Sequence, residues 1–536
     1  MLRRLIFQPA FQITFVMMPY MVSNMSSVCR EWGYAAVAAL LVVCTVVAGT
    51  LFGTPPTFQG TSYMENFAHY ADADQYARLG DALIHGSLSL DLPVPDALAE
   101  LDNPYDFESR YAASDGGANP VFWDHAFYQG QYYCYFGVVP ALLLYVPYQL
   151  VTGSWLATPV AVTVLGAGFV IAAALLVRRI ARRFFADSAT TATTIAALVL
   201  VVGGSNLAYL VSVPRFYSVP ILASLLFTML GLWFWLGARR DVHAPAHAAG
   251  LPGGSVPTLS WWHLAAGSAC MALNLGCRPQ FMLACFLALP IFWRDIVSDR
   301  LLFSRAGARE TCAALLPFVV VIAPLLWYNY ARFGSALDFG SSYNLTGFDM
   351  TSYQQSWRLT PTLLYFYLLQ PFDLSRQFPF VQSTDLSYSV GWAPTEPMFG
   401  GYLWLVPAAL LVFLLPAVRK VLKRRRLWGL CLLMVVFAAV VLVVDTRTAG
   451  VTQRYFGDFG WYVMLVASLV LFAVQAQRKE GQGLGARWGS LVFSGVAVAV
   501  ALSIVVGGAT LLSPSRYDSI AALNPALYAE AQGLFD

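Results

Sequence analysis

The hydrophobic residues of this chain gather in long continuous runs that are separated by polar segments of very different length. A helix needs about 20 apolar residues to cross a bilayer, so runs of this kind predict membrane-spanning helices. Eleven runs are expected to span, and two of these are short and joined by a tight turn. They cover 34–52, 155–177, 189–209, 216–236, 261–275, 280–293, 311–328, 401–417, 427–444, 461–475 and 488–511.

One further apolar run, 134–152, is interrupted by Pro140 and Pro147, and positive charge decides its assignment. Cytoplasmic loops carry an excess of Lys and Arg. If this run lies at the outer interface or re-enters without spanning, 22 of the 32 Lys and Arg residues fall inside, although the outer loops are much longer. We therefore predict eleven spans in the cell (plasma) membrane, with the N-terminus cytoplasmic and the C-terminus extracytoplasmic.

These spans define a single transmembrane domain over 34–511, with two large outer segments at 53–154 and 329–400. Residues 1–33 are ambiguous, because a basic start is followed by an apolar stretch that polar residues and a proline break. The tail 512–536 is polar and is expected to be external. The predicted fold is an all-α polytopic membrane protein whose first outer loop carries juxtamembrane helices.

Composition agrees with a membrane protein and excludes several other classes. Hydrophobic residues make up 58% of the chain and charged residues only 11%, whereas soluble domains carry roughly a quarter charged residues. The eight cysteines show no metal-site spacing, and no nucleic-acid partner is expected at a net charge of +3. The loop 239–260 is rich in Pro, Gly and Ala and is expected to be a flexible linker.

The first outer segment concentrates acids, aromatic residues and histidines, and its polar stretch 72–86 holds three of the acids. Apolar and small residues recur there at helical spacing, and Gly86 suits the position just past a helix end. Asp72 suits the N-cap of this helix and Asp74 its first turn. The two acids therefore have two open interpretations, as residues that only stabilise the helix start or as a catalytic pair.

The order of these features resembles the GT-C superfamily of polyprenyl-phosphate-sugar-dependent membrane glycosyltransferases. It is most similar to the branch of protein O-mannosyltransferases and lipid A aminoarabinose transferases, whose motif reads Asp-Glu-x-x-Tyr and is followed by a glycine. Asp72 and Tyr76 match the Asp and Tyr of that motif, whereas Ala73 stands in place of its Glu. Asp74 can compensate, so it stays open which acid is the base. The stretch 123–140, WDHAFYQGQYYCYFGVVP, resembles the juxtamembrane stretch of the branch.

The resemblance implies transfer of a sugar from a polyprenyl-phosphate donor in the bilayer to an extracytoplasmic acceptor, which can be a glycan, a lipid or a protein. Asp72 or Asp74 would take the proton of the acceptor hydroxyl as general base. A divalent cation, Mg²⁺ or Mn²⁺, held by these two acids is a candidate cofactor. The candidate substrate-binding residues are Tyr76, Asp124, His125, Arg278, Arg332 and Arg454.

The three arginines in this set are candidates because a guanidinium offers a bidentate fork to a leaving phosphate. An arginine beside a span end also commonly reaches out to lipid headgroups without any further role. We favour that simpler role for Arg332. We favour phosphate binding for Arg278, which lies in a short Gly-Cys-Arg-Pro turn between two spans.

A transporter or flippase of lipid-linked sugars, without catalytic activity, is the main alternative. Transport pathways place ionisable residues within the spans, whereas the apolar runs of this chain are nearly free of charge and its acids collect in outer loops. An intramembrane protease is a third class, but the chain has no HExxH motif. The sequence therefore favours an enzyme with its active site at the outer face.

Overall fold

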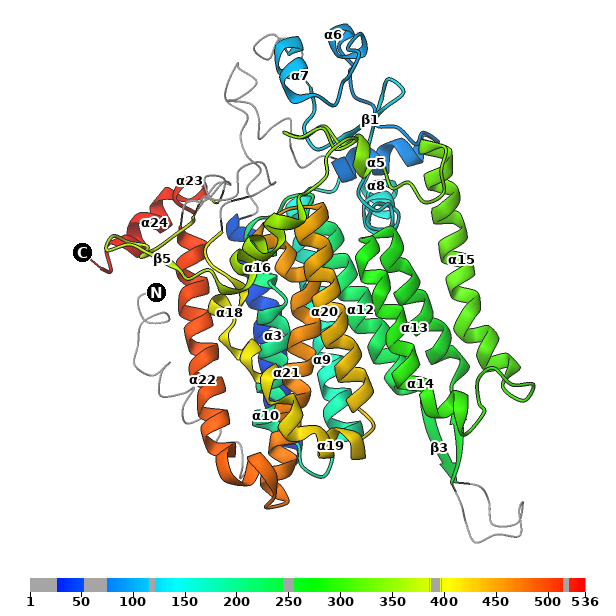
Figure 1. Ribbon diagram of the computed structural model, residues 1–536, viewed down its shortest axis with the longest axis vertical. Coiled ribbons are helices and arrows are strands. Elements are labelled where there is room, and N and C mark those ends of the chain that lie inside the picture. Colours follow the sequence, from blue (N-terminus) through cyan, green and yellow to red (C-terminus); the bar gives the residue numbers. More distant parts are fainter. Residues whose placement is uncertain are drawn as a thin grey trace.

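The computed structural model describes residues 27–52, 75–114, 121–243, 255–384, 386, 396, 398–513 and 520–535. Among these residues, eight helical stretches are long and apolar enough to cross a membrane. They are α3 (Ser27–Phe52), α9 (Thr158–Phe184), α12 (Ser218–Ala238), η4 with α14 (Pro279–Leu287 and Ala288–Val297), α15 (Ala308–Phe333), α20 (Trp428–Thr448), η8 with α21 (Gln453–Tyr455 and Phe456–Lys479) and α22 (Gly483–Leu512). Figure 1 shows them side by side in one bundle. The prediction of an all-α polytopic membrane protein is confirmed.

The three remaining predicted spans also lie on helices, but on shorter ones. They correspond to α10 (Thr191–Gly204) followed by α11 (Leu207–Ser212), to α13 (Trp261–Leu273), and to α18 (Tyr402–Leu405) followed by η7 (Pro407–Val418). The first of these breaks at Asn206, whose φ of 64° lies in the left-handed region that asparagine tolerates. The count of eleven spans stays a prediction.

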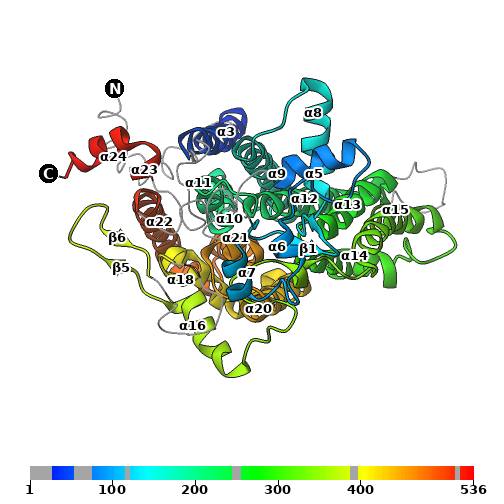
Figure 2. The ribbon, with the colours of Figure 1, turned by 90° about the horizontal axis from the view of Figure 1, so that it is seen from above.

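Helix α21 lies in the middle of the bundle, and its side chains are almost all buried. It packs against α10, α20, α22 and η7, as Figure 2 shows from above. Helix α15 lies at the edge, where Val319 and Val320 are 62% and 61% exposed. An apolar surface of this kind is compatible with lipid, in which a helix satisfies its own backbone hydrogen bonds.

The run 134–152 contains a helix that is shorter than a spanning helix, and its place at the interface stays a prediction. It forms a short π-helix, η2 (Ala141–Tyr145), that continues into α8 (Val146–Thr152). Twelve helical residues are about 18 Å long, well short of a bilayer core. Gly153, with a φ of 71°, ends α8. Helix α8 packs against α5 (Gln75–Ile84) at one end of the bundle (Figure 1).

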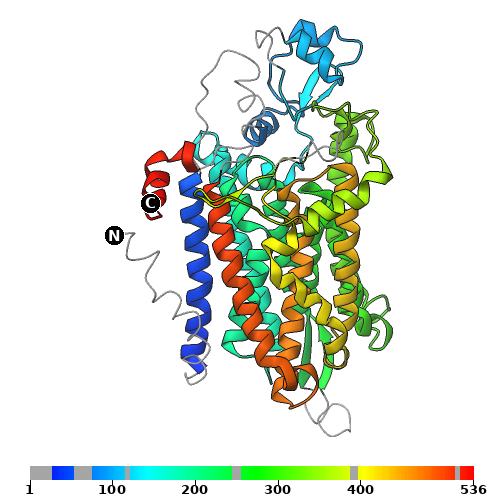
Figure 3. The same ribbon diagram turned by 60° about the vertical axis from the view of Figure 1, so that its left-hand side comes forward.

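The smaller elements divide between the two ends of the bundle, as Figures 1 and 3 show. One end carries α5, α6 (Asp96–Ala99), α7 (Phe107–Ala113), β1 (Ala126–Tyr128), β2 (Gln131–Tyr133), α16 (Thr360–Leu369), β5 (Asp373–Leu374), β6 (Val381–Gln382), α23 (Ile520–Leu523) and α24 (Pro525–Gln532). The other end carries α19 (Arg419–Arg424), β3 (Arg239–His243) and β4 (Ser255–Leu259). The two large segments predicted to be external therefore share one end, called the outer end below.

The loop 239–260 differs from the flexible linker expected from its composition. Its described residues form the antiparallel hairpin β3–β4, in which Arg239 pairs with Leu259. Nη1 of Arg239 lies 2.5 Å from Oδ1 of Asp295, and its Nη2 lies 2.8 Å from Oδ2 of Asp299. These ion pairs attach the base of the hairpin to the end of α14. The composition of the loop gives no indication of this attachment.

The two outer segments are joined to each other close to the bundle. The β1–β2 hairpin turns at Gln129 and Gly130, which both have positive φ, as tight two-residue hairpins require. Just before β1, the Asp124 amide donates to the Leu345 carbonyl at 2.9 Å, and the Leu345 amide donates to the His125 carbonyl at 3.0 Å. Segments more than 200 positions apart in the sequence are therefore hydrogen-bonded to each other at the outer end of the bundle.

Candidate functional site

The two acids predicted to be catalytic, Asp72 and Asp74, lie outside the described residues. Helix α5 is described from Gln75, so only the end of the predicted motif can be placed. Gly86 has a φ of 76°, as expected for a glycine just past a helix end. The helix predicted after the acids is confirmed, and the role of the acids stays a prediction.

Tyr76, the tyrosine of the predicted motif, is completely buried under α5. Its ring stacks on Tyr145 at a centroid distance of 5.5 Å and lies 6.5 Å from Phe136. These contacts attach α5 to the juxtamembrane stretch. Tyr76 therefore fixes the position of the segment that begins just after the predicted acids.

Asp124 is held in a buried polar site that also contains Tyr217 and Asn344, and we call these three residues the outer carboxylate site. The Tyr217 hydroxyl donates to Oδ2 of Asp124, and Nδ2 of Asn344 donates to Oδ1 at 3.1 Å. Asp124 is 8% exposed and has a φ of 55°. Both carboxylate oxygens are thus oriented by neutral donors, and the three residues come from three different parts of the chain.

Gln75 and His125 support the backbone of this site from the side of α5. Nε2 of Gln75 donates to the Asp124 carbonyl at 2.6 Å and lies 3.2 Å from Nδ1 of His125. Nδ1 of His125 also lies 2.8 Å from the Trp123 carbonyl. Burial lowers the pKa of His125 to about 4, so its imidazole is neutral near pH 7. His125 therefore holds the loop and does not bring a positive charge to a substrate.

Arg454 lies next to the outer carboxylate site, at the start of α21. Its guanidinium is 4.1 Å from the ring centroid of Tyr217 and 4.9 Å from that of Tyr455. Its Nη1 is 2.6 Å from Oε1 of Glu396, whose other oxygen accepts a hydrogen bond from Thr452 at 2.7 Å. The predicted candidates Asp124 and Arg454 are thus brought together on either side of one tyrosine.

Arg278 belongs to a second cluster, the bundle acid cluster, formed by Arg278, Gln280, Asp445 and Asp458. Nε and Nη2 of Arg278 donate to the two carboxylate oxygens of Asp458 at 2.7 and 2.5 Å. Nε2 of Gln280 lies 3.2 Å from Asp458 and 3.4 Å from Asp445. Both acids are at most 2% exposed. The guanidinium fork that the sequence suggested for a phosphate is engaged by a carboxylate of the chain itself.

The turn that carries Arg278 is packed directly against the juxtamembrane stretch. A Cβ atom on Gly137 would collide with the carbonyl oxygens of Gly276 and Cys277, so only glycine permits this approach. The Arg278 guanidinium lies 4.9 Å from the Tyr455 ring, which Arg454 also contacts. Tyr455 therefore contacts both Arg278, in the bundle acid cluster, and Arg454, next to the outer carboxylate site.

Arg332 lies at the end of α15 and is only 5% exposed, so it does not extend to lipid headgroups as its position in the sequence suggested. Its Nη1 donates to the Cys134 carbonyl at 2.7 Å and its Nη2 to Oδ1 of Asn329 at 2.9 Å. The guanidinium stacks on Tyr328 at 3.8 Å. Arg332 ties the residue that follows β2, Cys134, to α15.

Three residues that contact Asp124 or Arg454 were not predicted from the sequence. Tyr217 begins a predicted span, where interfacial tyrosines are common for other reasons. Asn344 belongs to an Asn-Leu-Thr sequence that has no evident meaning outside glycosylation. Glu396 lies in a polar stretch without a motif. Only their contacts with Asp124 and Arg454 identify them.

The divalent-cation site predicted at Asp72 and Asp74 is not covered by the described residues. Among the residues that are described, no group of three or more His, Cys, Asp or Glu side chains could hold a metal ion. The cation stays a prediction for the segment before α5.

No family model matches the chain, and no curated protein matches it in sequence. Two solved structures are similar to it over most of its length. The crystal structure of ArnT from Cupriavidus metallidurans bound to undecaprenyl phosphate has 10% identity and a TM-score of 0.41, over 93% of this chain and 77% of that one. The Archaeoglobus fulgidus oligosaccharyltransferase in the apo form has 12% identity and a TM-score of 0.40, over 92% of this chain and 56% of that one.

Proposed function

We propose that this chain is a GT-C-type membrane glycosyltransferase that transfers a sugar from a polyprenyl-phosphate donor to an acceptor hydroxyl at the outer end of the bundle. The observation that carries this proposal is the pairing of Asp124 and Arg454 on one tyrosine. Tyr217 binds the carboxylate through its hydroxyl and the guanidinium through its ring face. An acid and a cation are thereby fixed close together above the helix ends.

Glycosyl transfer needs both of these charges. The acceptor loses its hydroxyl proton to a carboxylate as its oxygen bonds to the anomeric carbon. The bond from that carbon to the phosphate oxygen breaks, and the lipid phosphate leaves with the electron pair. A guanidinium nearby stabilises the negative charge that develops on this phosphate.

The roles are divided between the two outer acids in this proposal. Asp72 is the general base, as its match to the motif of the GT-C branch suggests, with Asp74 as the alternative. Asp124 accepts a hydrogen bond from the acceptor and orients it. Arg454, which its pairing with Glu396 holds in place through one nitrogen, Nη1, faces the leaving phosphate. The donors on both oxygens of Asp124 support a fixed orientation, which lowers the cost of reaching the transition state.

The test is transfer by the purified protein in proteoliposomes that contain a panel of polyprenyl-phosphate sugars, measured as released polyprenyl phosphate. Asp72→Asn should lower the rate by about 10²–10⁴-fold, the usual contribution of a general base. Asp124→Asn should also lower kcat, but by a smaller factor than Asp72→Asn, because Asp124 orients the acceptor and does not take its proton. Asparagine tolerates the positive φ at this position, so this variant should fold. Asp102→Asn, an exposed outer aspartate, is the matched control and should be fully active.

Three outcomes would contradict parts of this proposal. An inactive Asp74→Asn beside a normal Asp72→Asn would exchange their roles. Full activity of both variants would exclude the segment before α5 as the source of the base. Wild-type kcat in Asp124→Asn would remove the outer carboxylate site from the reaction.

A transporter of lipid-linked sugars is less well supported by the position of the buried charges. Asp445 lies one turn before the outer end of α20, and Asp458 lies in the first turn of α21. Transport pathways place such groups near the middle of the spans. Both acids instead lie within one turn of the outer ends of their helices.

We propose that the outer end faces the outside of the plasma membrane, with the C-terminus external, because Lys and Arg accumulate at the other end. A cysteine introduced at Glu100 should react with an impermeant reagent added to intact cells, and one at Lys423 should not. Labelling at Lys423 alone would reverse the orientation.

A further inference from the structure

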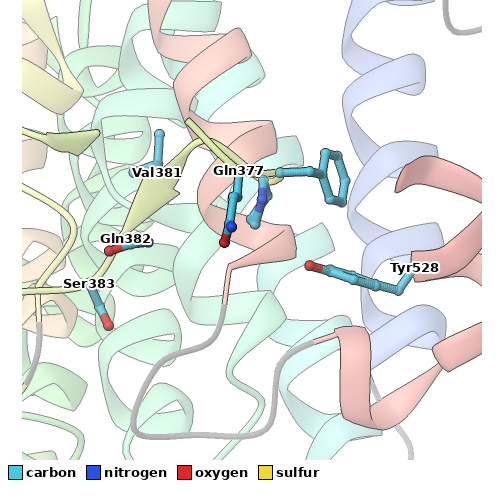
Figure 4. Close-up of a pocket in the computed structure, with 7 residues that line it drawn as sticks. Gln377, Val381, Gln382, Ser383 and Tyr528 are labelled. Atoms are coloured by element: carbon cyan, nitrogen blue, oxygen red, sulfur yellow. The ribbon is translucent and has the colours of Figure 1, made fainter. Parts of the chain in front are cut away.

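A second feature of the outer end is a cavity of about 280 Å³ between the β5–β6 hairpin and the C-terminal helix α24. It is lined chiefly by Gln377, Phe378, Pro379, Gln382, Ser383 and Tyr528, and Val381 completes the lining. Figure 4 shows Tyr528 extending from its helix toward Gln377, with Gln382 and Ser383 on the neighbouring stretch of the hairpin. Every lining residue is uncharged.

Aromatic packing holds the two walls of this cavity together. The Phe378 ring meets Tyr528 edge-on at 5.3 Å and lies 5.4 Å from Phe535. The Ser513 hydroxyl at the end of α22 donates to the Val381 carbonyl at 2.6 Å, which attaches the hairpin to the bundle. The cavity is thus lined by two separate parts of the chain, of which one is also attached to α22.

The lining has the chemistry of a site for a neutral polyhydroxylated molecule. The amides of Gln377 and Gln382 each donate and accept hydrogen bonds, as do the hydroxyls of Ser383 and Tyr528. A sugar needs such mixed partners for its hydroxyls, and the Phe378 ring offers an apolar surface to its C–H face. The volume lies just below the range of about 300–1,000 Å³ for small-molecule pockets, which suits a single sugar unit.

The segment that follows the cavity is hydrogen-bonded to the segment that carries Arg454. Thr384, next to Ser383, exchanges backbone hydrogen bonds with Met398 at 2.8 and 3.1 Å. The following residue, Phe399, donates its amide to Oε1 of Gln453 at 3.4 Å, and Gln453 precedes Arg454. These buried contacts fix the position of the cavity relative to Arg454.

We propose that this cavity binds a neutral sugar unit of the acceptor, at a distance from the hydroxyl that receives the new sugar. The acceptor is then a glycan rather than a simple lipid or a protein side chain. That the bound sugar belongs to the acceptor rests on the proposed function. Binding of a neutral saccharide in the cavity does not depend on catalysis.

The test is saturation-transfer NMR on the full chain in detergent, without a lipid donor. The probes are neutral trisaccharides of glucose, mannose, galactose and arabinose, together with a uronic-acid trisaccharide. At least one neutral probe should bind. The double variant Gln377→Ala/Gln382→Ala should weaken it about tenfold, because two neutral hydrogen bonds are lost. Both glutamines are exposed, so the variant should fold. Gln482→Ala, an exposed glutamine at the other end of the bundle, is the matched control.

Each outcome has a definite meaning. Binding of no neutral probe, binding that the double variant leaves unchanged, or equal binding of the uronic-acid probe would each overturn the inference. Saccharide binding that depends on the two glutamines, in a protein that transfers no sugar, would uphold the cavity and reject the proposed function. Transfer to a glycan with a kcat/KM that the double variant leaves unchanged would uphold the function and reject the cavity.

Discussion

The outer carboxylate site and the bundle acid cluster both bury aspartates at the same end of the helices, but they treat the charge differently. Asp124 receives hydrogen bonds from two neutral groups, Tyr217 and Asn344. Asp458 is bound at both oxygens by the guanidinium of Arg278. The first arrangement orients a carboxylate without neutralising it, and the second neutralises a carboxylate within the protein.

This difference separates a chemical role from a structural one. A buried ion pair contributes little net stability, but removal of one partner leaves an uncompensated charge in an apolar place. Neutral donors such as Tyr217 and Asn344 orient a carboxylate without forming an ion pair with it. Because Tyr455 contacts Arg278 as well as Arg454, the ion pair also fixes one wall of the outer carboxylate site.

The largest expected effect on stability comes from breaking the bundle acid cluster. Arg278→Met leaves Asp445 and Asp458 buried without their cation and should destabilise the fold by about 3–5 kcal/mol. The double variant Arg278→Met/Asp458→Leu should recover much of this loss. The measurement is the apparent Tm of the purified protein in detergent.

The control for this experiment is an exposed ion pair at the other end of the bundle. Arg424 and Glu480 lie 2.6 Å apart with side chains 58% and 30% exposed, so Arg424→Met should cost about 0–1 kcal/mol. An Arg278→Met protein of normal Tm that has lost transfer would instead restore the phosphate-binding role expected from the sequence.

A smaller effect, on activity as well as on stability, is expected at Tyr217. Tyr217→Phe keeps the ring under Arg454 but removes the hydrogen bond to Asp124. A hydrogen bond to a charged group contributes about 1.5–3 kcal/mol to stability, so the Tm should fall, and kcat should fall about tenfold because the carboxylate loses one of the donors that orient it. Tyr402→Phe, which loses a hydrogen bond to the Gly204 carbonyl, should lower the Tm but leave kcat unchanged. Equal kcat for Tyr217→Phe and wild type would place Asp124 outside the reaction.

The smallest expected effect is a pH dependence of stability caused by His125. Its pKa is lowered by burial to about 4 in the folded protein, against about 6.5 in an unfolded chain. A lowered folded pKa gives stability that is complete above pH 6.5 and is lost as the pH falls toward 4. His125→Gln should therefore show a smaller fall in Tm between pH 7 and pH 4.5 than wild type. An identical fall in both proteins would mean that His125 is not buried as described.

Local patterns were enough to predict much of the architecture. All eleven apolar runs lie on helices, because the length and hydrophobicity of a segment decide whether it prefers a bilayer. The run 134–152, kept at the interface in the prediction because of the charge distribution, forms only a short helix. Gly86 was placed just past α5 because glycine adopts a positive φ at low cost. The conclusions on the apolar runs and on Gly86 depend on neighbours in the sequence.

The partners of the site residues depended on the tertiary structure. Tyr217 and Asn344 lie 93 and 220 positions from Asp124, and Asp458 lies 180 positions from Arg278. The helix ends also extend past the apolar runs, so that Asp445 and Asp458 lie on helices and not in loops. The sequence by itself determined which segments enter the membrane and which chemistry collects outside it. Only helix packing decided which carboxylate binds a cation and which binds neutral donors. These contacts join segments that are far apart in the sequence, and no local pattern predicts which of them lie close together in the fold.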